Sequence, residues 1–169
     1  MGFEWTSSPN GNNLHRVVMF RDGAERASQI VPFSTFDSEN PEDLWDWLQA
    51  YEDGTGGRTM AFAHNGNWGT GMMFALERFK GGAIDEAYAA KRSRWEPIYE
   101  ATQIKGDSEA HPLLSPNDEF ADFGTWDKGD VGGRNAITKE MLPHQYVRSA
   151  LRLGLQQEAK LGVNPFKFC

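Results

Sequence analysis

The pattern of apolar and polar positions predicts short strands that alternate with amphipathic helices. Runs rich in β-branched and aromatic residues, each followed by glycine, serine or asparagine, predict strands at residues 3–6, 15–20, 58–63 and 99–105. A long loop follows the last of these strands, from residue 106 to about residue 117.

Helical spacing of apolar residues predicts helices at residues 38–53, 85–95 and 143–161. The first is the clearest, because Asn40 can cap it and Pro41 fits its first turn. Trp45 and Trp47 on this helix are interpreted as core packing rather than as a ligand cage.

This order of strands and helices predicts an α/β fold in one domain over residues 1–169, with a parallel sheet as the default. In such folds the chemistry gathers where strands end. The strand-end segments are 4–8, 64–67 and 106–111, and each places a carboxylate or an imidazole beside small polar residues.

Each candidate residue has a functional and a structural interpretation. Glu4 lies inside an apolar strand, where it is either exposed on an edge strand or buried with a metal, a cation or several donors. His64 follows a buried strand and is either a ligand or a hydrogen-bonded structural histidine, and His15 is either exposed or part of a site. Glu109 and His111 form a Glu-X-His pair, which is a weak motif by itself.

His144, at the start of the last helix, is interpreted as a solvated residue.

Composition narrows the function classes. The chain of 169 residues carries a net charge of −7 with an isoelectric point near 5.1, which argues against a nucleic-acid footprint and against binding to an anionic membrane surface. It has no signal-peptide pattern and no apolar run of the roughly 18–20 residues that span a bilayer. Cys169 is the one cysteine, so the chain forms no internal disulfide, and the cell compartment stays undetermined.

Familiar catalytic motifs are missing from the sequence. There is no phosphate-binding Gly-X-X-X-X-Gly-Lys, no Gly-X-Gly-X-X-Gly, no Gly-X-Ser-X-Gly and no His-Glu-X-X-His. Imidazoles and carboxylates at successive strand ends remain, and metal centres of Zn, Mn or Fe are built from such side chains.

Long motifs at residues 2–9, 12–18, 64–67, 103–116, 120–123 and 161–168 resemble one large bacterial family. That family is catalogued as a domain of unknown function and is allied to the PHP superfamily, named for polymerase and histidinol phosphatase domains. The resemblance implies a distorted β/α barrel with divalent metal ions (Zn, Mn or Fe) at the C-terminal ends of its strands. It also implies a metal-dependent hydrolase of small-molecule phosphoesters or related esters.

The resemblance assigns roles to five residues of this chain. Glu4 corresponds to a bridging carboxylate, and His64 to a metal ligand that also takes part in catalysis. Glu109 is expected to act in catalysis or to contact the substrate, and His15 and His111 are expected as further metal ligands.

Family members are longer and carry an Asp-X-His-X-His strand and an Asp-X-His motif that this chain lacks. We therefore expect the central piece of a PHP-like protein, folded as an incomplete barrel or a small α/β sandwich. A homo-oligomer is expected to cover its exposed strand edges. The alternative function is a non-catalytic, truncated α/β module that binds metal weakly or not at all.

Overall fold

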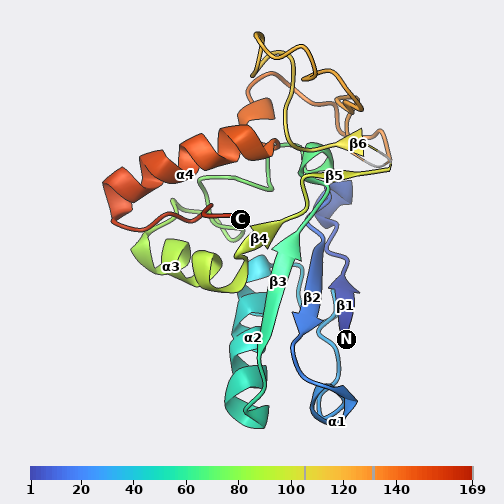
Figure 1. Ribbon diagram of the computed structural model, residues 1–169, viewed down its shortest axis with the longest axis vertical. Helices are drawn as coiled ribbons and strands as arrows, with labels where there is room; N and C mark the ends of the chain where they lie inside the picture. The colour runs from blue at the N-terminus through green and yellow to red at the C-terminus, as the bar shows by residue number, and fades with distance from the viewer. Residues whose placement is uncertain (105, 131, 169) are drawn as a thin grey trace.

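The computed structural model describes residues 1–104, 106–130 and 132–168, and it has a mixed four-stranded sheet at its centre (Figure 1). The strands lie in the order β1-β2-β3-β4. Their bounds are β1 Gly2–Trp5, β2 Arg16–Phe20, β3 Thr59–Ala63 and β4 Ile98–Tyr99. The α/β class is confirmed, and the described residues form an open sheet and no closed barrel.

The expected parallel sheet is wrong for two of the three strand pairings. β1 pairs antiparallel with β2, and β2 antiparallel with β3, whereas β3 and β4 are parallel. The connection from β1 to β2 contains no α-helix that could carry the chain across the sheet, as a parallel pair requires. Between β2 and β3 the chain first returns along the sheet, since the backbone carbonyl of Ser38 accepts a hydrogen bond from Trp5 Nε1 at 3.2 Å. The helix that follows therefore brings β3 in antiparallel to β2.

Four α-helices are described: α1 Ala24–Ala27, α2 Pro41–Thr55, α3 Glu86–Trp95 and α4 Val147–Leu161. The side chain of Asn40 accepts a hydrogen bond from the backbone of Glu42, which confirms the predicted cap of α2. In Figure 1, α2, α3 and α4 all lie on the side of the sheet away from β1.

The main core forms between α2 and one face of the sheet. Trp5 and Val18 of the sheet and Leu44, Trp45 and Leu48 of α2 are almost fully buried in one cluster. This confirms that Trp45 is a core residue; its neighbour Trp47 packs against the same cluster.

The opposite face of the sheet, which we call the open face, is defined by Glu4, Val17, Met19, Met60 and Phe62. Successive side chains of a strand point to opposite faces, so these residues alternate with the buried core positions. They remain partly or fully exposed, and Met19 is 43% exposed.

The region after β4 is mostly turns. The strand expected at 99–105 is instead β4 followed by a small hairpin of β5 (Thr102–Gln103) and β6 (Gly106–Asp107). Residue 105 of the expected strand and Cys169 lie outside the described residues. Short 3-10 helices are η1 Pro9–Gly11, η2 Gly66–Trp68 and η3 Leu142–His144.

The last helix begins later than predicted, because η3 occupies the expected first turn. His144, predicted to be solvated, is half-buried, with its Nδ1 3.0 Å from the carbonyl oxygen of Phe74.

No helix in the described ranges has the length and apolar character that crossing a membrane requires.

Candidate metal centre

Three candidate ligands from three segments meet at one end of the open face. Glu4 lies near the end of β1, His15 directly precedes β2, and His64 directly follows β3. Because β2 runs antiparallel to both neighbours, its start lies beside the ends of β1 and β3. The strand directions therefore gather into one site three residues of which the first and last, Glu4 and His64, are 60 positions apart.

The distances between these side chains suit a shared cation. Glu4 Oε1 lies 2.9 Å from His15 Nδ1 and 3.7 Å from His64 Nε2. One ligand atom from each residue lies within 4.8 Å of the others. Metal–ligand bonds of about 2.0–2.2 Å keep ligand atoms roughly 3–4 Å apart, so a small side-chain adjustment would let all three bind one ion. Two imidazoles and one carboxylate form a donor set that suits Zn, Mn or Fe.

The outer ring nitrogens of both histidines have polar neighbours. His15 Nε2 lies 2.9 Å from Ser8 Oγ, and His64 Nδ1 lies 3.4 Å from Gln103 Nε2. A histidine that binds metal through one nitrogen carries a proton on the other, which needs an acceptor. The Ser8 hydroxyl oxygen can accept a hydrogen bond from this N–H, and so can the Gln103 amide once it is rotated to present its oxygen.

The sequence analysis did not assign Ser8 and Gln103 to the candidate site. Both lie inside segments singled out for their resemblance to a known family, and Ser8 also lies in the strand-end segment 4–8.

The environment of the cluster favours neutral imidazole. Burial lowers the pKa of His15, and the neighbouring His64 lowers it further, while the carboxylate of Glu4 acts in the opposite direction. Neutral imidazole is the form that binds metal ions. The side chain of Glu4 is 41% exposed on the edge strand, so the cluster is open to solvent on that side.

Glu109 and His111 lie outside this three-residue cluster. Glu109 Oε1 pairs with Arg148 at 2.8 Å, and Arg148 also pairs with Asp118. His111 is buried, with its Nε2 3.4 Å from Asp127 Oδ2. The loop after β6 therefore engages both residues in pairs of its own, and the structure does not bring them to Glu4.

A buried ion network supports the start of β2 from the core side. Glu96 Oε1 accepts hydrogen bonds from Arg16 Nε and from Trp45 Nε1, each at 2.9 Å, and Arg92 Nε lies 3.3 Å from Glu96 Oε2. Burial would raise the pKa of Glu96, but the guanidinium groups of Arg16 and Arg92 outweigh it and lower the pKa. Arg16 also donates to the carbonyl of Leu14. These bonds hold the backbone on both sides of His15.

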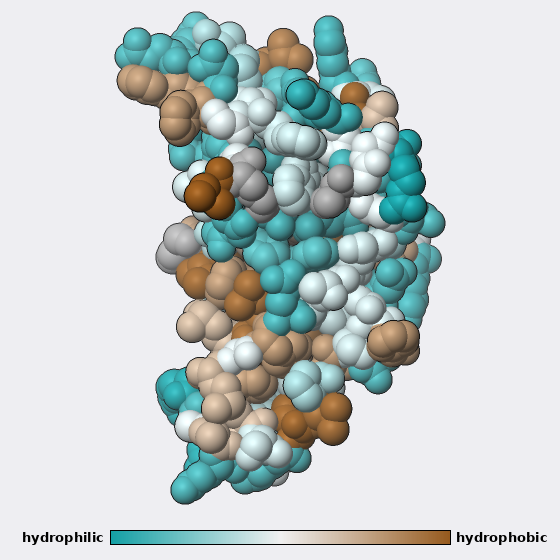
Figure 2. Space-filling view, turned by 90° about the vertical axis from the view of Figure 1, so that its right-hand side faces the viewer, coloured by the Kyte–Doolittle hydropathy of each residue, from teal (hydrophilic) through white to brown (hydrophobic). Residues whose placement is uncertain are grey.

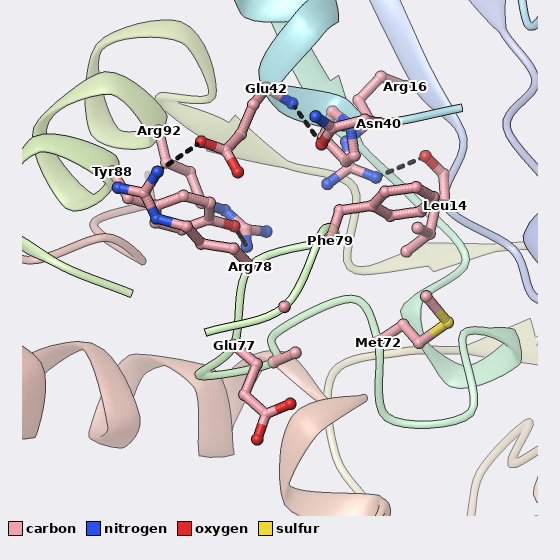
Figure 3. Close-up of a pocket in the computed structure, with 13 residues that line it drawn as sticks. Leu14, Arg16, Asn40, Glu42, Met72, Glu77, Arg78, Phe79, Tyr88 and Arg92 are labelled. Atoms are coloured by element: carbon pink, nitrogen blue, oxygen red, sulfur yellow. Dashed lines mark hydrogen bonds and ion pairs between the residues drawn. The ribbon is translucent and has the colours of Figure 1, made fainter. Parts of the chain in front are cut away.

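Arg16 and Arg92 also line a cavity of about 280 Å³ between the sheet, α2 and α3 (Figure 3). Leu14, Asn40 and Tyr88 line it as well. The cavity lies on the core side of β2, so it is separate from the cluster of Glu4, His15 and His64.

Fold and site together define the class: an open-sheet α/β protein with a two-histidine, one-carboxylate candidate metal centre at one end of the sheet. Residues 1–169 match the family model described as "Protein of unknown function (DUF3604)", and the chain belongs to this family. No curated protein and no solved structure matches the chain. The resemblance to a domain of unknown function is thereby confirmed; the family description does not mention PHP enzymes.

Proposed function

We propose that the protein is a metal-dependent hydrolase of small-molecule phosphoesters or related esters. The observation that carries the proposal is the convergence of Glu4, His15 and His64 at one end of the sheet. The PHP likeness of the sequence supports the same chemistry, and with it the proposal that the open sheet is part of a distorted β/α barrel.

The residues of the cluster have distinct roles in this proposal. Glu4, His15 and His64 would hold a divalent Zn, Mn or Fe ion, and Ser8 and Gln103 would orient the two imidazoles. The ion would supply Lewis acidity toward the substrate oxygen and make a water molecule more acidic. The exposed side of Glu4 leaves room for a substrate to approach. Glu109 and His111 have no role in the cluster itself.

Metal analysis and activity on the same preparations test the proposal. The purified protein, dialysed and then loaded with Zn or Mn, should hold a divalent metal, and Glu4→Gln and His64→Ala should hold less. Hydrolysis of p-nitrophenyl phosphate or bis-p-nitrophenyl phosphate should stop with a chelator and return with Mn or Zn. Activity in His64→Ala should fall by orders of magnitude, because the metal contributes several kcal/mol to the barrier reduction.

Glu119→Gln, which changes an exposed carboxylate outside the cluster, is the matched control. It should retain both metal and activity. Hydrolysis that a strong chelator does not affect would contradict the proposal.

A second candidate is the non-catalytic module, in which metal binding is weak or absent. It is favoured by the ion pairs that occupy Glu109 and His111, since these leave only three gathered ligands in the described part of the chain. Little or no bound metal after loading, together with no hydrolysis of either substrate, would support this candidate over the enzyme.

Self-association through the edge of the sheet is part of the proposal. β1 is an edge strand, and its outer side has no strand partner among residues 1–104, 106–130 and 132–168. Unpaired edges attract other strands, so we propose that a second copy covers β1.

A further inference from the structure

The open face is polar at both ends: the candidate metal centre of Glu4, His15 and His64 lies at one end, and arginines lie at the other. Along β2 and β3 the facing pairs are Val17 with Phe62 and Met19 with Met60. Beyond these pairs, each of the two strands continues on this face with an arginine: Arg21 directly after β2 and Arg58 directly before β3. The backbones of these two arginines are joined by a 3.0 Å hydrogen bond.

A cavity of about 450 Å³ lies at this end. Its apolar lining includes Met19, Met60 and Pro97, and its charged lining consists of three arginines, Arg21, Arg58 and Arg94. Figure 2 shows apolar surface gathered in the lower half of the molecule, with hydrophilic surface at the lower tip. The volume lies within the range of about 300–1,000 Å³ typical of small-molecule sites.

The arginines outnumber their carboxylate partners. Arg58 Nη1 and Arg94 Nη2 share one oxygen of Glu52, at 2.8 and 2.9 Å. The other oxygen of Glu52 accepts the backbone N–H of Thr59 at 3.0 Å. Arg21 makes no ion pair with any residue that the structure describes.

The nearby carboxylate of Asp22 is engaged with Arg26. Three guanidinium groups therefore line the cavity, and one carboxylate, that of Glu52, pairs with two of them, in a chain whose net charge is −7.

Two of these guanidinium groups are held in place. Glu52 is nearly buried and fixes Arg58 and Arg94, and Arg94 also lies 4.3 Å over the ring of Trp95. Each guanidinium has five N–H donors, so single bonds to Glu52 leave donors for a second acceptor. Methionine side chains adapt their shape to an apolar partner.

We propose that this cavity binds an amphiphilic monoanion, a carboxylate on an unbranched apolar chain. The carboxylate pairs with Arg21, Arg58 and Arg94, whose planar groups match it in geometry, and the chain lies on Met19 and Met60. The site is at the other end of the strands from Glu4, and it does not depend on the proposed hydrolase activity.

Methyl NMR of the full chain labelled with ¹³C-methyl methionine tests the site directly, since two of its six methionines line the cavity. Sodium octanoate should shift the Met19 and Met60 methyl signals in a saturable way. Acetate has the charge without the chain, and 1-octanol has the chain without the charge; each should bind at least tenfold more weakly. Octylammonium, with the opposite charge, should bind more weakly still.

Variants test whether octanoate binding depends on the arginines that line the cavity. Arg21→Gln removes an exposed arginine and should weaken octanoate binding at least threefold without unfolding the chain. The double variant Arg58→Gln/Arg94→Gln should weaken it at least tenfold, and Arg152→Gln on α4 should leave it unchanged. Equal affinity for octanoate and 1-octanol, no saturable shift, or a saturable response confined to Met72 and Met73 would overturn the proposal.

Discussion

Glu4 is exposed as its structural interpretation expects, and it also lies beside two histidines. It lies on an edge strand and is 41% exposed, as the structural interpretation expects, yet its carboxylate lies 2.9 Å from His15. A carboxylate on an edge strand stays accessible to solvent, whereas a buried carboxylate would need full compensation.

The neighbours of the two imidazoles give a prediction at the residue scale. Ser8→Ala removes the acceptor for the outer nitrogen of His15 and should weaken zinc affinity by about 10–100-fold, the usual cost of losing such a partner. Competition against a chromophoric chelator measures this affinity. Ser115→Ala, on the loop after β6, is the control and should bind zinc as the unmodified chain does. Equal affinities for both variants would show that Ser8 does not orient His15.

Metal binding should also depend on pH. Protons compete with metal for the imidazoles, and burial lowers the pKa of His15, so His15 loses its proton at a lower pH than an ordinary histidine does. Zinc affinity should therefore be level near pH 7 and fall once the pH drops below the usual histidine pKa of about 6.5. Chelator competition between pH 5 and pH 8 checks this, and an affinity that rises toward low pH would contradict it.

At the scale of elements, one buried carboxylate joins the sheet to two helices. Glu96 follows α3 and binds Arg16 of β2, Trp45 of α2 and Arg92 of α3. With one carboxylate gone, two guanidinium groups would stay buried without their counter-ion, which is more costly than exposing them. The network therefore fixes the position of the helices on the sheet.

Glu96→Gln should lower the free energy of unfolding by about 3–5 kcal/mol, the range for removing one partner of a buried ion pair. Urea denaturation followed by tryptophan fluorescence measures the change. Glu86→Gln, on the first turn of α3 and exposed, should change it by less than about 0.5 kcal/mol. A small effect of Glu96→Gln would mean that α3 is held mainly by its apolar contacts.

The same group should make stability sensitive to acid. The folded-state pKa of Glu96 is lowered, so its stabilising contribution is fully present above the ordinary glutamate pKa of about 4.3 and is lost as the pH falls through the lower folded-state value. Urea midpoints measured between pH 2 and pH 7 should fall less steeply with acid in Glu96→Gln than in the unmodified chain. Parallel curves for the two proteins would exclude Glu96 as a source of this dependence.

At the scale of the whole molecule, α2 packs on one face of the sheet, and the other face and the β1 edge are left accessible. The candidate metal centre of Glu4, His15 and His64 and the arginine-lined cavity lie at the two ends of the open face, with apolar side chains between them. An open sheet of this kind exposes backbone donors and acceptors along β1 as well as apolar area.

Self-association is the prediction at this scale. Sedimentation velocity at several protein concentrations should show a dimer that gains population as concentration rises, because pairing at β1 satisfies its exposed backbone groups. A sedimentation coefficient of a compact monomer at every concentration would contradict pairing through β1.

Local signals predicted much of the fold. The three main helices and three of the strands lie close to their predicted positions, since periodicity, the Asn40 cap and Pro41 act within a few residues. The break in the strand at 99–105 was not predictable from these signals, because β4 and β5 are each only two residues long.

The sequence by itself determined where the three main helices and the first three strands lie, and it marked Glu4 and His64 as polar residues at strand ends. Only the tertiary structure decided that β2 runs antiparallel between β1 and β3, and so brings His15 between them. It likewise decided that Glu109 pairs with Arg148. Strand direction and side-chain partners depend on how long connections cross the sheet, and no periodicity within a strand or helix encodes that path.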